Sequence, residues 1–368
     1  MSRPGPIRVL AFATQGSGGD DEHRLRRLTS NLNPTFFGFA HASKWKSFTQ
    51  LLRLMRERTN DVAIMEGTGL AGGAALLLGK LMFGLPYVLS SGDAIAPFLA
   101  AKYPLGAPFF RLYEKLLCHY CAGFVGWTPY LVGRALTLGA PRGMTAPGWA
   151  PFKQNPETRR RSRVQLRAKL GIPTDALVFG IAGSLTWSRR YKYCYGLELV
   201  QAALKSERAD LRVLIVGDGE GLPYLKQMAG LELGERIIFT GRVAREQVPG
   251  YLAAMDVGSL PQSVDGVGNF RYTTKVSEYI AAGLPFVTGQ IPAAYDLGLD
   301  CLWRLRGSAP WDPQFLSDLT RLMDSVTLDN IHAKSDLLPG LAHRFDECAQ
   351  VASFTAFVRD VLEERRQP

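Results

Sequence analysis

Short apolar runs that end in glycine or a polar turn alternate with helix-forming stretches along most of this chain. In the first half each run is followed by a stretch typical of a helix. Strands that alternate with helices predict parallel sheets covered by helices on both faces, which is the α/β class. The strands expected in this half are residues 7–14, 35–40, 61–65, 87–91 and 123–127.

The same alternation restarts after an interruption around residues 147–173. Several prolines and the basic run at residues 159–161 mark this segment as an inter-domain connection. A chain of 368 residues exceeds what one hydrophobic core usually serves, so two domains are expected. We predict two Rossmann-like, doubly wound domains at residues 1–170 and 171–342, and a closing helix at 343–368 that crosses back to the first domain. The strands expected in the second half are residues 177–182, 211–216, 236–240, 257–260 and 285–288.

The composition, 46% hydrophobic and 21% charged residues, is ordinary for a soluble globular protein. The first residues have no apolar core of a signal peptide, so none is expected. The apolar stretch 70–89 is broken by Lys80, Gly84 and Pro86. It predicts a buried helix and then a buried strand, because a membrane helix needs about 20 uninterrupted apolar residues.

The cysteines indicate neither a disulfide framework nor a metal site. Five cysteines, an odd number, favour reduced thiols and a cytoplasmic location. Cys118 and Cys121 form a C-x-x-C pair, but the chain lacks a second ligand pair at suitable spacing. We therefore expect two small apolar residues on one helix, and no metal.

The net charge is +10, of which residues 1–170 carry +14 and the slightly acidic remainder carries −4. Such a basic half fits an anionic membrane surface or an acidic acceptor, and it equally fits a solvated face. Peripheral attachment at the inner face of the membrane is thus one expectation. Nucleic acid is not an expected partner, because no aromatic platform or recognition motif accompanies the charge. The early basic residues are Arg24, Arg26, Arg27, Lys44, Lys46, Arg53, Arg56 and Arg58.

Two turns suggest a ligand that carries phosphate. The glycine-rich turn 16–19 follows the first expected strand, where the bare backbone of Gly18 and Gly19 can approach an anion. Tight strand-to-helix packing explains the turn equally well. It lacks the spacing of a dinucleotide fingerprint and the lysine of a P-loop. The loop 184–192 carries Arg189, Arg190 and Lys192, whose charges can neutralise a diphosphate leaving group.

The segment 271–285 places Lys275 at a helix start and Glu278 three residues later, before a turn into a strand. Taken alone, an acidic residue in a first helical turn is a plain partner of the helix dipole. Together with its neighbours the segment resembles the GT4-type retaining glycosyltransferases of the GT-B fold. Four stretches align in order with that family and cover residues 175–290: 178–192, 213–219, 238–243 and 256–285.

The resemblance implies roles for individual positions. Glu278 falls on the glutamate that hydrogen-bonds the ribose hydroxyls, and Arg189 falls on the phosphate-binding lysine. Gly18 and Gly19 approach the donor phosphates from the first domain. The other donor-binding positions are Ser184, Arg190, Gly241, Arg242, Val243, Asn269 and Tyr272, of which Gly241 to Val243 frame the nucleobase.

The chain departs from the family pattern at three places. Phe270 stands where the family has its first glutamate, so Asn269, Asp265 or the 266–271 backbone takes its role beside the donor sugar. Ser184 replaces a phosphate-binding arginine. Gly92 and Asp93 stand near the position of a histidine, and Asp93 is a candidate contact to the acceptor or the donor sugar, or else a helix cap.

The resemblance implies a transferase whose donor is a nucleotide-diphosphate sugar, linked to UDP or GDP, with no metal or other cofactor. Arg189, with help from Arg190, Lys192 or Lys275, would stabilise the leaving phosphate. The acceptor would attack from the same side, so that the anomeric configuration is retained. The acceptor is expected to be lipid-linked or a glycan. Two alternatives share this fold: a nucleotide-sugar 2-epimerase, and a silent nucleotide-sugar-binding partner subunit. An NAD-dependent oxidoreductase is not supported, because no acidic residue follows a true fingerprint.

Overall fold

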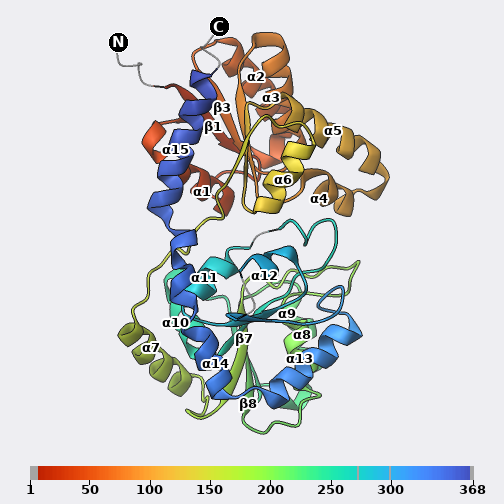
Figure 1. Ribbon diagram of the computed structural model, residues 1–368. Helices are drawn as coiled ribbons and strands as arrows, with labels where there is room; N and C mark the ends of the chain where they lie inside the picture. The colour runs from red at the N-terminus through yellow and green to blue at the C-terminus, as the bar shows by residue number, and fades with distance from the viewer. Residues whose placement is uncertain (1–6, 272, 298–299, 365–368) are drawn as a thin grey trace. The chain divides into compact units, whose positions relative to one another are not determined.

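The computed structural model describes residues 7–271, 273–297 and 300–364. The chain forms two compact units, shown in Figure 1. Unit 1 comprises residues 1–148, 270–272 and 346–368, and unit 2 comprises residues 149–269 and 273–345. Two α/β units were expected from the sequence, and each is described here by itself.

The centre of unit 1 is a six-stranded parallel sheet in the order β2-β1-β3-β4-β5-β6. Its inner strands are buried on both faces, which explains their continuous apolar sequences. The strands are β1 (Val9–Ala13), β2 (Thr35–Phe36), β3 (Val62–Glu66), β4 (Tyr87–Ser91), β5 (Gly123–Gly126) and β6 (Gly143–Thr145).

Helices cover both faces of this sheet. The chain runs from β1 to the edge strand β2, and then returns past β1 to β3 and the following strands. Crossovers between parallel strands are right-handed, so the helix before this reversal and the helices after it lie on opposite faces of the sheet. One face carries α1 (Asp20–Leu28), against which α15 (Glu347–Glu363) packs. The other face carries α2 (Lys44–Arg56), α3 (Leu70–Phe83), α4 (Ile95–Lys102), α5 (Ala107–Tyr120) and α6 (Pro129–Thr137).

Unit 2 repeats the architecture with a six-stranded parallel sheet in the order β12-β11-β10-β7-β8-β9. A register shift between Ile215 and Val216 lets Val216 pair with Gly241 at the end of the sheet. The strands are β7 (Leu177–Ala182), β8 (Leu211–Val216), β9 (Ile237–Gly241), β10 (Val257–Leu260), β11 (Phe286–Thr288) and β12 (Leu302–Arg304).

Two sets of helices cover the sheet of unit 2. The first set is α8 (Leu197–Ala203), α9 (Leu222–Ala229) and α13 (Pro313–Ser325), and α13 packs against α8. By the same rule of right-handed crossovers, the other face carries α10 (Val248–Ala254), α11 (Lys275–Ala281) and α12 (Pro292–Asp296). The remaining helices are α7 (Pro156–Lys169), which packs on α10, and α14 (Leu328–Ser335).

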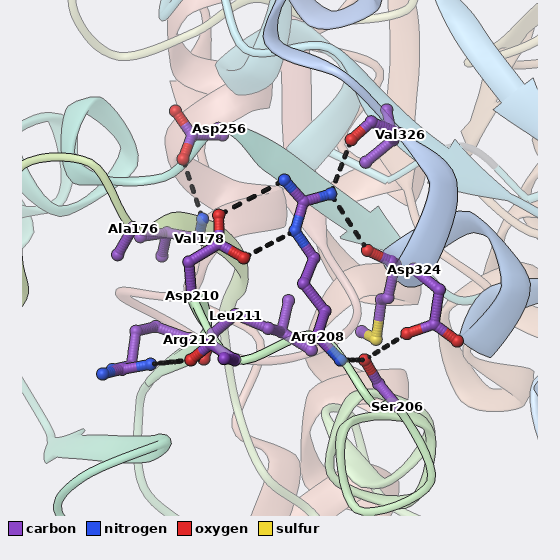
Figure 2. Close-up of polar contacts among 12 residues, drawn as sticks. Ala176, Val178, Ser206, Arg208, Asp210, Leu211, Arg212, Asp256, Asp324 and Val326 are labelled. Atoms are coloured by element: carbon purple, nitrogen blue, oxygen red, sulfur yellow. Dashed lines mark hydrogen bonds and ion pairs between the residues drawn. The ribbon is translucent and has the colours of Figure 1, made fainter.

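Side-chain hydrogen bonds fasten α13 to the loop between α8 and β8 (Figure 2). The Arg208 guanidinium donates to the Asp210 carboxylate at 2.8 Å and to the carbonyl of Val326 at 2.6 Å. The Ser206 hydroxyl donates to Asp324 at 2.5 Å. These bonds fix the end of α13, whose residues Phe315 and Met323 enter the core of unit 2.

The connecting helix α7 belongs to unit 2, whereas the sequence placed the domain boundary after it, at residue 170. Arg167 of α7 is 2% exposed and donates to the Asp256 carboxylate at 2.7 Å and to backbone carbonyls on either side. Asp256 also accepts from the amide of Val178, as Figure 2 shows, and from Arg163. This buried network joins α7 to the amino ends of β7 and β10, so the units divide between Gly148 and Trp149.

The structure contains two strands that the sequence did not predict, β6 and β12, each of three residues at an edge of its sheet. The apolar stretch 70–89 forms α3 and β4, a helix and then a strand, as expected. Among the described residues, no helix has the length and apolarity needed to cross a membrane.

Candidate active site

The loops at the carboxyl end of the unit 2 sheet lie closely against one another. The amide of Leu185 donates to the carbonyl of Asp218, and the amide of Gly217 donates to that of Gly241. A Cβ atom on Gly217 would lie 1.9 Å from the carbonyl oxygen of Gly183, and the φ of 143° also requires glycine there. Loops from β7, β8 and β9 therefore form one continuous backbone rim.

Lys275, at the start of α11, brings a positive charge to this rim. Its ammonium nitrogen lies 4.7 Å from the centroid of the Tyr195 ring and about 3 Å from where a Cβ on Gly183 would be. The Tyr195 hydroxyl accepts a hydrogen bond from the amide of Gln262, at the end of β10, at 3.2 Å. The ammonium group of Lys275 therefore lies beside the backbone of Gly183, where its charge can attract an anion.

Glu278 lies one helical turn after Lys275, and both side chains are partly exposed. Residues three apart lie on one side of a helix, so the carboxylate and the ammonium group share a side of α11. The structure thereby brings together two of the residues singled out from the sequence.

Arg189 and Arg190 lie at the exposed tip of a small hairpin whose base is the backbone pairing of Ser188 with Tyr193. The Arg190 guanidinium lies over the ring of Tyr191, which stacks on Trp311 at 4.7 Å. At the start of the same loop the hydroxyl of Ser184, also exposed, bonds that of Thr186 at 2.8 Å. The loop therefore presents its cations to solvent.

A buried carboxylate that the sequence analysis missed holds the base of that hairpin. Glu198 in α8 is fully buried and accepts from the hydroxyls of Tyr193 at 2.7 Å and Ser259 at 2.8 Å, and from the amide of Gly196. Burial raises the pKa of the Glu198 carboxyl. No local signal could have found it, because an acidic residue in a first helical turn is common.

The expected nucleobase turn lies at the end of β9. Gly241 has a φ of 69°, and its carbonyl accepts from the amide of Gly217 and from the hydroxyl of Thr240. Arg242 is exposed, and Val243 is half-buried. These residues belong to the same rim as Lys275.

The loop after β10 is organised by Asp265, whose carboxylate accepts from the amides of Val267 and Gly268 and from the hydroxyl of Ser263. This carboxylate is a turn-forming group in the structure. Next to it, the amide oxygen of Asn269 is buried and, among the described residues, has no hydrogen-bond partner. Tyr272, another candidate, lies outside the described residues.

Phe270 and Arg271 group with unit 1. The carbonyl of Phe270 accepts from the Thr128 hydroxyl at 2.9 Å, and its ring lies 5.2 Å from the Arg134 guanidinium. Arg271 donates to the carboxylate of Asp93 at 2.6 Å. Asp93 is therefore part of an ion pair, and it is not the N-cap of α4, which is Ala94.

The carboxyl end of the unit 1 sheet has its own buried network, which the sequence analysis also missed. Glu66, at the end of β3, is fully buried and accepts from Arg24 at 2.6 Å, from the Ser90 hydroxyl at 2.7 Å and from the Trp127 ring nitrogen at 3.0 Å. Arg24 also lies over the Trp127 ring at 4.5 Å. The network joins α1, β3, β4 and β5.

The glycine turn of unit 1 differs from its expected role in one respect. The amide of Gly18 donates to the Glu22 carboxylate at 2.7 Å, so that amide is already occupied. Gly19, the N-cap residue of α1, precedes Asp20 and Asp21. Burial and the nearby Glu66 carboxylate raise the pKa of Asp21 to about 7.

The early basic residues do not form one free patch. Arg24 is buried against Glu66, Arg26 pairs with Glu22, and Arg27 pairs with Glu347. Cys118 and Cys121 are both buried at the end of α5, where the thiol of Cys121 donates to the carbonyl of Cys118. Within the described ranges, no group of three or more His, Cys, Asp or Glu residues could hold a metal ion.

Two Rossmann-like units with these sheets define a protein of the GT-B fold class. HepE of Anabaena, solved with UDP and glucose, has a TM-score of 0.71 at 14% identity, over 96% of this chain and 100% of that one. Sucrose-phosphate synthase of Thermosynechococcus elongatus has a TM-score of 0.69 at 12% identity, over 97% and 100%. A glycosyltransferase of Rickettsia africae has a TM-score of 0.66 at 11% identity, over 98% and 99%.

Residues 176–300, which lie in unit 2, match the model of the glycosyl transferases group 1 family. The match confirms the resemblance to glycosyltransferases of the GT-B fold that the sequence shows. A 2-deoxystreptamine glucosyltransferase of Streptomyces kanamyceticus is 25% identical over 189 residues, which are 50% of this chain and 45% of that protein. The alignment thus spans about half the length of this curated relative.

Proposed function

We propose that this protein is a GT4-like glycosyltransferase that moves a sugar from a nucleotide-diphosphate sugar to an acceptor hydroxyl. The observation that carries the proposal is the position of Lys275 beside Tyr195 and Gly183, on the glycine rim of the domain that matches the family. The structure similar to this chain that holds UDP and glucose supports a UDP-linked donor, and GDP is the second candidate.

The diphosphate of the donor binds the rim of unit 2. Lys275 and Arg189 stabilise the charge that develops on the leaving oxygen as the bond between the anomeric carbon and that oxygen breaks. The electron pair of the broken bond goes to the diphosphate, and the acceptor oxygen forms the new bond on the same face, with retention. The acceptor proton passes to the leaving phosphate, so no protein base and no metal are required.

Further residues bind the other parts of the donor. Glu278 accepts from the ribose hydroxyls, Gly241, Arg242 and Val243 frame the base, and Ser184 and Arg190 line the phosphates. Asn269 offers its buried amide oxygen to the sugar, in the role that Phe270 cannot fill. Gly18, Gly19, Asp93 and Tyr272 complete the list of proposed contacts. The acceptor is a lipid-linked sugar or a glycan, and the protein works in the cytoplasm, at the membrane surface.

A thermal-shift screen against UDP, GDP, ADP, TDP and their sugar conjugates tests the donor site. A ligand at about 100 times its Kd adds roughly 2.7 kcal/mol to the free energy of unfolding. We expect one nucleotide family to stabilise the protein and Glu278→Ala to abolish the shift, while Glu232→Ala, in the half-buried turn after α9, retains it. No shift with any nucleotide would contradict the proposal.

Slow hydrolysis of the bound donor separates an active transferase from the silent binding subunit. Release of free sugar supports the transferase, whereas tight binding without release supports the subunit. Inversion of the configuration at C2 of the donor sugar would instead indicate the epimerase. The family match does not favour either alternative.

A further inference from the structure

A stripe of large apolar side chains on unit 1 is exposed to solvent. It runs from Tyr103, 53% exposed, through the fully exposed Leu105 and along α5, where Phe109 is 60% exposed. Monomeric soluble proteins rarely expose such a continuous apolar surface without a partner. We call this surface the α5 face, and it consists of Tyr103, Leu105, Phe109, Leu112, Leu116 and Tyr120.

The spacing of these residues places them on one side of the helix. Within α5 they recur at intervals of three and four residues, the repeat of a single helical stripe. The adjoining side of α5 faces the interior of unit 1, with Phe110, Tyr113 and Leu117 buried, and the ring of Phe109 stacks on that of Tyr113 with centroids 6.4 Å apart. The stripe therefore borders the side through which α5 packs on the core, and its own side chains remain exposed to solvent.

Every exposed charged residue next to the stripe is cationic. Lys102, Arg111 and Lys115 are all exposed. Glu114 is the one acidic residue in the segment 94–120, and it is buried, where the Arg134 guanidinium donates to it at 2.9 Å. The α5 face thus combines aromatic and leucine side chains with a positive border that no exposed carboxylate offsets.

We propose that the α5 face docks on an anionic lipid bilayer. A helix with cations on its polar side and Phe, Tyr and Leu on its apolar side lies in the interface of a membrane, where the cations meet lipid phosphates. Aromatic rings such as Phe109 and Tyr120 enter the headgroup region. Within unit 1, α5 lies on the side away from α15 (Figure 1), and the side chains of the α5 face are exposed to solvent.

The inference rests on the peripheral-membrane element of the proposed function and specifies its surface. It places that surface on α5 and the turn before it, and not on Arg24, Arg26 and Arg27, which are engaged in ion pairs. Lys275 and Glu278, on which the test of donor binding depends, lie in unit 2 and outside the α5 face, so the two proposals can fail separately.

Co-sedimentation of the full chain with vesicles tests the docking. The vesicles are made of phosphatidylglycerol and phosphatidylcholine, or of phosphatidylcholine alone. We expect binding to the anionic vesicles that weakens with salt, and at least about a tenfold loss in Phe109→Ser/Leu112→Ser and in Arg111→Glu/Lys115→Glu. The matched controls are Leu231→Ser, at a fully exposed leucine of unit 2, and Arg53→Glu on α2, and both are expected to bind as the parent does.

Circular dichroism and the nucleotide thermal shift are measured on each variant, so that loss of fold is separated from loss of docking. Retained nucleotide binding with lost vesicle binding supports the α5 face. Absent binding of the parent chain to anionic vesicles would overturn it, as would equal binding by the parent and the α5 variants. A parent dimer that Phe109→Ser/Leu112→Ser converts to a monomer would overturn it in favour of a second copy of this chain.

Discussion

The ammonium group of Lys275 lies 4.7 Å from the centroid of the Tyr195 ring, at the carboxyl end of the unit 2 sheet. The two residues are 80 positions apart in the chain, and the loop after β7 and the start of α11 bring them together. Tyr195 is held in turn by Gln262. These contacts hold the ammonium group of Lys275 beside Gly183.

Lys275→Ala removes that charge. We expect kcat of donor hydrolysis to fall by about 10²–10³, the usual cost of losing one stabiliser of developing charge. Lys226→Ala, at an exposed lysine on α9, serves as the control and should keep the parent rate. Steady-state kinetics with the nucleotide sugar found in the binding screen measures both. Equal rates for the two variants would remove Lys275 from the mechanism.

Arg189→Ala tests the tip of the loop between β7 and α8. If the exposed guanidinium moves onto the leaving phosphate when donor binds, kcat should fall by at least about tenfold while KM changes little. Arg212→Ala, a position on β8 whose side chain donates to the carbonyls of Ala209 and Leu211, is the control. A rise in KM with kcat intact would show that Arg189 contributes only ground-state binding.

Glu66→Ala leaves Arg24 buried without its carboxylate. We expect a loss of about 3–5 kcal/mol in the free energy of unfolding, because the uncompensated charge stays in the interior. Glu57→Ala breaks a solvent-exposed pair with Arg53 and should cost less than about 1 kcal/mol. Urea unfolding measures both variants. Equal costs would indicate that water reaches the Arg24 site.

Asp21 makes stability depend on pH. Its pKa rises from 3.8 to about 7 because it is largely buried and lies near Glu66, with Arg24 opposing the shift and Asp93 and Asp20 adding to it. The folded state thus binds more protons than the unfolded state between about pH 4 and 7, and stability falls as the pH rises through this range.

Asp21→Asn removes this titration. We expect its Tm to exceed that of the parent by at least about 3 °C at pH 8, and the difference to shrink toward pH 4. Asp175→Asn, at an exposed position, should follow the parent profile. Calorimetry between pH 4 and 8 gives the comparison. A constant difference across this range would contradict the raised pKa.

The sequence by itself determined the α/β class and most of the sheet strands. The bounds expected for β7, β8 and β10 are those of the structure, because a buried parallel strand reads as an apolar run that ends in glycine or a turn. The sequence also placed Lys275 and Glu278 on one helix. Their common side follows from helical geometry alone.

Only the tertiary structure decided the edge strands, the place of α7 and the buried polar networks. The strands β6 and β12 are too short to show a pattern, and they form because a neighbouring strand offers its hydrogen bonds. Arg24 and Glu66 are 42 residues apart, and Arg167 and Asp256 are 89 apart. From the sequence alone, a charged residue is expected to be exposed to solvent. Only the folded structure supplies the partner that allows its burial.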